Sequence, residues 1–212
     1  MATVLTPTEG TLSPAALFQS VGVAPTGQVA WRQRIPSSAH GVYIVSLHSD
    51  ADDSTGLAEA PLDRSPITEW MALTPPWTVH GHRLGVDDVA AHMAQWWLPR
   101  TSILYVGTAK TLSSRVADYY RTTLGAHKPH AGGYWIKTLS VLSTVTVHYH
   151  VATGPIGSER DIESKLQNSF LSGYGQVPDA HPEPNLPLPW ANLEIAKPKP
   201  RRRRLHGLSD RK

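Results

Sequence analysis

Two runs of β-branched and aromatic residues, far apart in the chain, limit most strongly what it can fold into. The first is "GVYIVSLH" at 41–48, and the second is "SILYVGT" at 102–108. Runs of this length and density predict buried strands. A third run, "STVTVHYHV" at 143–151, alternates strictly between apolar and polar positions, so it predicts a strand with one apolar and one polar face. The chain is therefore expected to form a sheet of three strands.

The segment between the first two runs, residues 49–100, reads as a long insertion. Its first part is small, acidic and proline-containing, which predicts a loop. "ITEWMAL" at 67–73 predicts a short helix, and a better helix is predicted at about 86–98, where large apolar residues fall near one face. Because a sheet of three strands is near the lower limit for stability, the Trp-rich insertion is expected to pack onto it.

Two further helices are predicted after the second run. Thr111 or Ser113 can cap a helix that continues to about residue 124. Ser158, with Asp161 three residues later, predicts a capping box at the start of a helix that ends near residue 173. Between them, "YWIKTLS" at 134–140 fits a strand and a helix equally well.

These signals predict one α+β domain with extensions at both ends. Residues 1–28 are rich in Thr, Pro, Gly and Ser, with only "PAALFQSV" as a possible helical turn or two, so they are expected to form a poorly ordered arm. The domain itself is assigned to 29–195. A chain of 212 residues with 40% hydrophobic composition can bury one good core but scarcely two.

The formal net charge of +3 hides an asymmetry between the domain and the tail at 196–212. The tail holds eight basic residues and one acidic residue, a net of +7, which leaves −4 on the remainder of the chain. Two interpretations remain for the tail: a solvated, proline-stiffened extension, or a phosphate contact that would make binding salt-dependent. Under the second interpretation the run Arg201, Arg202, Arg203 and Arg204 binds nucleic acid.

Other simple features narrow the chemistry and the location. The chain has no cysteine, which excludes disulfides, thiolate zinc sites and cysteine nucleophiles, so any metal must bind oxygen or imidazole. No stretch approaches the run of about 18 apolar residues that spans a bilayer, and the N-terminus lacks the pattern of a secretory signal. A cytoplasmic protein that does not contact a membrane is expected.

Particular residues then resemble a known family. Gly41-Val42-Tyr43 on the first strand, Tyr105-Val106-Gly107 on the second, Arg115 eight residues later, a helical glutamate and a late asparagine follow the order of the GIY-YIG nuclease superfamily. The segment "YVGTAKTLSSR" carries most of the resemblance. Within the superfamily, "GAHKPHAGGYWIKTL" and "LPWANLE" are most similar to a group of uncharacterised actinobacterial proteins.

The resemblance implies a fold, an activity and a set of roles. It implies a three-stranded, mainly antiparallel sheet flanked by helices, with 49–100 as an elaboration because Gly41 and Tyr105 lie 64 positions apart. It implies a nuclease in which Arg115 clamps the phosphate and Tyr43 and Tyr105 lie at the attacking water. Tyr119 occupies a position that is His or Tyr in relatives.

The residues themselves suit phosphodiester hydrolysis, which needs activated water on one side and a cation on the developing charge. Tyr43 would need a neighbouring cation to act as phenolate or to orient water, since a phenol has a pKa of about 10. Lys110 and Arg115 are the available cations. Arg115 and Tyr119 lie four positions apart and share one face of the predicted helix, where both can reach one phosphate.

Glu163 is the predicted metal ligand. It falls in the apolar stripe of the last helix, and a carboxylate there calls for a partner. A Mg²⁺ or Mn²⁺ ion held by this carboxylate and by waters would be typical of phosphate chemistry. Glu159 is the alternative, but it lies in the first turn, where it is expected to reach solvent. The alternative is that Glu163 has no functional role and that its side chain extends toward Arg160 or Lys165.

The remaining candidates come from loops and from the proline-rich end. Asn192 in "PWAN" is preferred to Asn185 as the family asparagine. By resemblance, His127 acts at the leaving oxygen or binds phosphate, and the alternative is a solvent-exposed loop histidine. The other predicted nucleic-acid contacts are Lys128, His130 and Lys137. Aromatic residues next to Lys137 can stack on bases, although in a small domain they more often form core.

Two functions from different classes remain at this point. The first is a Mg²⁺- or Mn²⁺-dependent endonuclease that hydrolyses DNA without a small-molecule cofactor. The second is a non-catalytic nucleic-acid-binding protein on the same fold. The set of Tyr43, Tyr105, Arg115, Glu163 and Asn192 favours the first, since a binding module needs no carboxylate facing a polyanion. A more remote expectation is that the Trp-rich insertion docks a protein partner.

Overall fold

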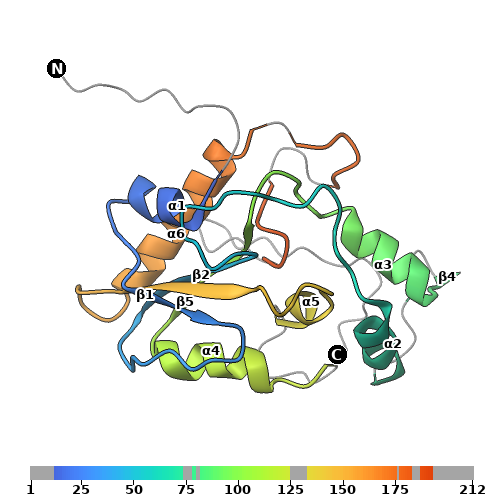
Figure 1. The fold of residues 1–212 in the computed structure, drawn as a ribbon, viewed down its shortest axis with the longest axis horizontal. Helices are drawn as coiled ribbons and strands as arrows, with labels where there is room; N and C mark the ends of the chain where they lie inside the picture. The colour runs from blue at the N-terminus through green and yellow to red at the C-terminus, as the bar shows by residue number, and fades with distance from the viewer. Residues whose placement is uncertain are drawn as a thin grey trace.

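The computed structural model shows an α+β fold around an antiparallel sheet of four strands in the order β1-β6-β2-β5 (Figure 1). It describes residues 12–73, 78–79, 82–124, 133–175, 177–182 and 187–192. The strands of this sheet are β1 (Gly27–Ala30), β2 (Gly41–Ser46), β5 (Ile103–Ala109) and β6 (Thr146–Val151). A separate pair is formed by β3 (Thr78–Val79) and β4 (His82–Arg83).

Helices cover both faces of the sheet. They are α1 (Pro14–Ser20), α2 (Arg64–Leu73), α3 (Val86–Ala94), α4 (Leu112–Arg121), α5 (Gly133–Lys137) and α6 (Ser158–Gly173). Figure 1 shows α1 and α6 together on one side of the sheet, α4 on the other, and α2 and α3 beyond its end. Among the described residues, no helix is both long and apolar enough to cross a membrane.

The central strand β2 explains the dense apolar run that begins at residue 41. It pairs with β5 on one side and β6 on the other, and all six of its residues are buried. Because successive side chains point to opposite faces, Val42 and Ile44 pack with α1 and α6, while Tyr43 and Val45 belong to the larger core on the other face. A strand covered on both faces cannot show the alternating pattern of a half-exposed one.

The predicted count of three strands is one too low, and the predicted disorder of 1–28 is wrong for residues 12–28. β1 pairs with β6 as the fourth strand. The helix α1 begins at a Ser13 cap, whose hydroxyl accepts a hydrogen bond from the Ala16 amide at 3.1 Å. Leu17 and Phe18 are fully buried in the core beside α6. Burial of these two large apolar side chains stabilises the short helix, although the residues around it in the sequence are polar.

Helix ends and caps also differ from prediction, and one of them is the end of α4 at Arg121, which was expected near residue 124. α3 ends at Ala94, not near 98, and Trp97 beyond it donates a hydrogen bond from Nε1 to the Leu57 carbonyl at 2.8 Å. The predicted capping box at Ser158 does not form, since the residue that caps α6 is Gly157, in the left-handed region with φ of 110°. The ambiguous segment at 134–140 forms α5, a single helical turn followed by turns.

The insertion packs onto the sheet as expected. Trp70 of α2 and Met93 of α3 belong to the same buried cluster as Val45 of β2. Trp190 from the far end of the chain joins them, since its Nε1 donates to the Met93 carbonyl at 3.0 Å and its ring lies 5.3 Å from that of Trp97. The insertion therefore completes the core that a small sheet alone would lack.

Candidate functional site

Three tyrosines from three elements meet on the larger-core face of the sheet. Tyr43 lies on β2, Tyr105 on β5 and Tyr119 on α4, and their ring centroids are 5.4 to 5.9 Å apart. Tyr43 and Tyr119 are buried, whereas Tyr105 is partly exposed. The structure thus brings the two predicted strand tyrosines together. It places Tyr119 in the core beneath them, and not on the surface beside a phosphate.

Steric crowding explains why glycine occupies positions 41 and 107 of the two strand motifs. A Cβ on Gly107 would lie 2.4 Å from Cε1 of Tyr105 and 3.0 Å from Cζ of Tyr43. A Cβ on Gly41 would lie 2.1 Å from the backbone oxygen of His150 on the neighbouring strand. Glycine at these positions leaves the space that the stacked phenol rings and the paired backbone occupy.

Burial governs the acidity of the tyrosines. It raises the pKa of Tyr43 well above its usual value, Tyr105 raises it further, and the attraction of Arg115 offsets this only in part. Burial likewise raises the pKa of Tyr119 and of Tyr105. In the folded chain desolvation outweighs the attraction of Arg115, which disfavours the phenolate form of Tyr43. A protonated phenol can still orient water or another group.

Glu163 on α6 is partly buried close to the same cluster. Burial raises its pKa to about 7, while the positive charges of Arg115 and Arg160 lower it and the neighbouring Glu159 raises it. The side chain also influences the pKa of Tyr43 and of Tyr105. Glu163 therefore stands within electrostatic reach of the predicted arginine and both strand tyrosines.

Glu159 lies one turn earlier on α6. It was predicted to reach solvent, but the structure buries it. Its side chain is 1% exposed, and Oε2 lies 2.9 Å from Nδ1 of His40 and accepts a hydrogen bond from the Gly157 amide at 2.6 Å. Although burial raises its pKa, these hydrogen bonds bring it below the usual value. His40 was not predicted as a site residue, since it is 119 positions from its partner and no local pattern marks it.

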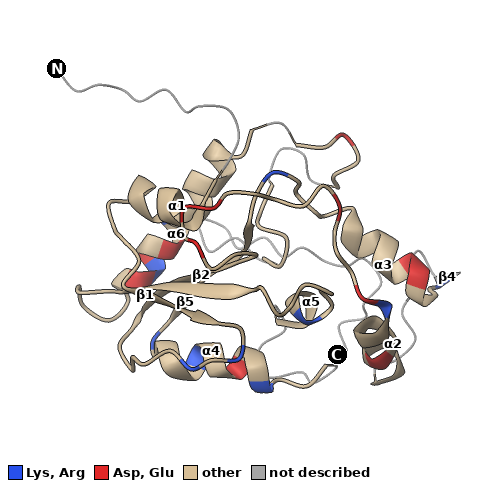
Figure 2. Cartoon of the chain, viewed as in Figure 1, with Lys and Arg blue, Asp and Glu red and all other residues tan. Residues whose placement is uncertain are grey.

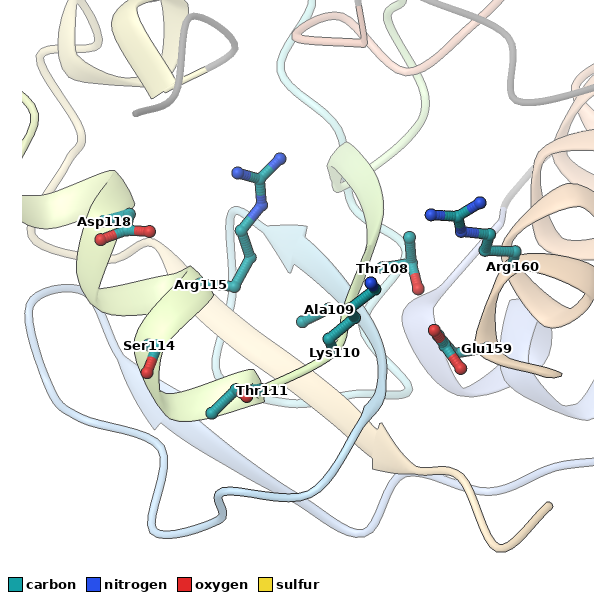
Figure 3. A pocket seen from close by; sticks show the side chains of 9 residues that line it. All are labelled: Thr108, Ala109, Lys110, Thr111, Ser114, Arg115, Asp118, Glu159 and Arg160. Carbon is teal, nitrogen blue, oxygen red and sulfur yellow. The ribbon is translucent and has the colours of Figure 1, made fainter. Parts of the chain in front are cut away.

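The end of β5 opens into a pocket of about 390 Å³ between α4 and α6 (Figure 3). Arg115 extends from α4 and Arg160 from α6, with Lys110 after β5 between them. Lys110 is exposed and Arg115 is partly exposed, so both predicted cations can reach a ligand in solvent. Figure 2 shows basic and acidic positions side by side on α4 and α6. The acidic residues that line the pocket are Asp118 and Glu159.

Asn192 lies at the sheet and not in the pocket. Its side-chain Oδ1 accepts a hydrogen bond from the Val106 amide and its Nδ2 donates to the Val106 carbonyl, both at 2.8 Å. The preceding Ala191 amide donates to the Leu104 carbonyl at 2.9 Å. Because both ends of the amide are used by the backbone next to Tyr105, Asn192 is a positioning residue, and the predicted catalytic role is replaced by a structural one.

Lys137 is not placed for the predicted nucleic-acid contact. Its Nζ donates to the carbonyls of Tyr120 and Thr122 at the end of α4. Burial and repulsion from Arg32 lower its pKa. The adjacent Tyr134 and Trp135 are 6% and 2% exposed, so they are core and not a stacking surface. The remaining predicted contacts, His127, Lys128, His130, Arg201, Arg202, Arg203 and Arg204, lie outside the described residues.

Comparison with protein-family models, curated proteins and solved structures found no match to this chain. The site therefore has to be judged on its own geometry.

Glu163 can hold the predicted divalent ion only as one ligand among waters and phosphate oxygens. Within the part of the chain that the structure describes, no group of three or more His, Cys, Asp or Glu side chains is arranged to hold a metal. A complete protein cage is thus not formed by these residues. Mg²⁺ at phosphates commonly uses only one or two carboxylates, with water and phosphate oxygens supplying the rest. A partly buried carboxylate with a raised pKa gains from a nearby cation, and Glu163 meets this condition.

Proposed function

We propose that this chain is a divalent-metal-dependent endonuclease of the GIY-YIG type that hydrolyses phosphodiester bonds in DNA, in the cytoplasm. One observation carries the proposal. The charge of Arg115 on α4 lowers the pKa of Tyr43 on β2, of Tyr105 on β5 and of Glu163 on α6, and β2 and α6 are far from the other two elements in sequence. A core has no need of a guanidinium and a carboxylate at the same place.

Each residue has a distinct task in this proposal. The Arg115 guanidinium binds the non-bridging oxygens of the scissile phosphate and stabilises the charge that develops there. Glu163 would hold Mg²⁺ or Mn²⁺, which supplies Lewis-acid stabilisation when bound. Tyr105, the one of the three tyrosines that is partly exposed, orients water, and the buried Tyr43 holds the Tyr105 ring through a stacked contact at 5.8 Å. Tyr119 supports both rings from below.

The alternative is a non-catalytic nucleic-acid-binding protein on the same fold. The burial of the Tyr43 and Tyr119 hydroxyls favours it, since neither can touch substrate without rearrangement. The position of Glu163 favours the enzyme, because a carboxylate beside two arginines only weakens the binding of a polyanion. We place the enzyme first on this ground.

Nicking of supercoiled plasmid by the purified protein, with Mg²⁺ or Mn²⁺ and with chelator, tests the proposal. Nicking is expected with metal only. Arg115→Ala and Glu163→Gln are each expected to lower the rate by roughly a hundredfold or more, as for the loss of a group that stabilises transition-state charge. Arg34→Ala and Glu69→Gln remove the same charges at exposed positions and serve as matched controls.

The outcomes separate the two functions. DNA binding without any nicking by the wild-type chain would support the binding protein. Nicking that survives both Arg115→Ala and Glu163→Gln at full rate would contradict the site and point to a contaminating nuclease. Loss of nicking in both variants, with rates near wild type in both controls, would support the enzyme.

A further inference from the structure

The pocket at the end of β5 contains a cation that the proposed mechanism does not use. Arg160 lies in the first turn of α6, across the pocket from Arg115 on α4 (Figure 3). Lys110 lies between them, after the last residue of β5. The link between β5 and α4, α4 itself and the distant α6 thus bring three positive charges to one open pocket.

The acidic groups of the pocket are engaged elsewhere. Asp118 pairs with Arg121 at 3.1 Å, and Glu159 pairs with His40 at 2.9 Å. Among the described residues, the ion pairs at contact distance leave out all three pocket cations. Glu163 lies within electrostatic reach of Arg115 and Arg160 and offsets part of their charge. Three cations against this one further carboxylate still leave the pocket suited to an anion.

Arg160 is held on a fixed element. The neighbouring Glu159 side chain ties the first turn of α6 to the Gly157 amide and to His40, which directly precedes β2. This contact fixes the start of a helix of 16 residues relative to the central strand. The Arg160 backbone therefore has a fixed place beside the pocket, from which its exposed side chain can reach an anion opposite Arg115.

We propose that Arg160 is a substrate-binding residue and that the pocket holds two neighbouring phosphates of one nucleic-acid strand. Arg115 contacts the phosphate to be cleaved, Arg160 contacts the next one, and Lys110 lies between them. A volume of about 390 Å³ is within the range of small-ligand sites and exceeds the need of a single phosphate. The assignment of the cleaved phosphate rests on the proposed function, but the binding of the strand does not.

Binding is measured first, without turnover, as the fluorescence anisotropy of a short labelled DNA duplex and of its single strand in chelator at several salt concentrations. Arg160→Ala is expected to weaken binding by roughly three- to tenfold and to reduce the salt slope by about one, the value for one lost phosphate contact. Arg160→Lys should restore the slope, and Arg160→Glu should weaken binding further. Lys165→Ala, an exposed charge on the same helix, is the matched control.

Cleavage kinetics then distinguish binding from chemistry. Arg160→Ala is expected to raise KM with kcat retained, whereas Arg115→Ala lowers kcat. Unchanged affinity and salt slope in Arg160→Ala would overturn the inference, and so would an effect no larger than that of Lys165→Ala. If the wild-type chain binds but never cleaves, an effect of Arg160→Ala on affinity would sustain this inference while the proposed function fails. If the wild-type chain cleaves DNA but Arg160→Ala has no effect on binding, the proposed function would stand and this inference would fail.

Discussion

Gly107 is the residue at which the two strand tyrosines leave no space for a side chain. We expect Gly107→Ala to push the Tyr105 ring off Tyr43, since an added Cβ would lie 2.4 Å from Cε1 of Tyr105. Overpacking of this kind costs about 1–3 kcal/mol of unfolding free energy. Urea denaturation measures it, and Thr108→Ala on the next position of β5 is the control, with an expected cost below about 1 kcal/mol. Equal costs for the two variants would contradict the steric argument.

Glu163 is expected to make stability depend on pH. Its pKa is about 7 in the folded chain against 4.5 for the free group, so the folded state binds more protons between these values. The free energy of unfolding therefore falls as pH rises through this window, and the loss is complete above it. Glu163→Gln removes this titration and should be more stable than wild type by about 1–3 kcal/mol near pH 8.

Urea denaturation of both proteins at about pH 5 and about pH 8 measures this difference. Glu69→Gln, an exposed glutamate on α2, is the matched control. The prediction fails if the stability difference between Glu163→Gln and wild type is the same at both pH values.

At the scale of elements, the edge strand β5 is covered by a single side chain at its middle. Asn192 satisfies both the amide and the carbonyl of Val106, and its own side chain is buried. Asn192→Ala leaves two buried backbone groups without partners, so it should cost about 2–4 kcal/mol. Denaturation and loss of hydrogen-exchange protection at the Val106 amide measure the effect. Asn168→Ala, on the exposed side of α6, should change neither quantity.

The elements themselves differed in how far local pattern could predict them. β6 was predicted from its alternation, and β2 from its apolar density, because both signals come from neighbouring residues. β1 was missed because four residues with one buried side chain carry too little pattern, and the strand is formed by pairing with β6. The cap of α6 was predicted at Ser158, but Gly157 is the capping residue. Its left-handed backbone starts the helix one position earlier than the Ser158–Asp161 pattern indicates.

At the scale of the whole molecule, charge divides between the domain and the tail. The tail at 196–212 carries +7 and the remainder −4, so the tail should supply most of the non-specific attraction to DNA. Deleting it is expected to weaken DNA binding at low salt and to lower the salt slope by roughly 3–6 units. Fluorescence anisotropy against salt measures this, and an unchanged unfolding midpoint is the control for folding. An unchanged slope would mean that the tail is only a solvated extension.

The sequence by itself determined the strands β2, β5 and β6, the helices α4 and α6, and the order of Tyr43, Tyr105 and Arg115. These follow from spacing between near neighbours, which needs no knowledge of the folded chain. Tertiary structure alone decided the partners that lie far apart in sequence: His40 with Glu159, and Asn192 with Val106. It also decided which groups lose water on folding. Desolvation is a property of the packed state, and it raises the pKa of both Tyr43 and Glu163.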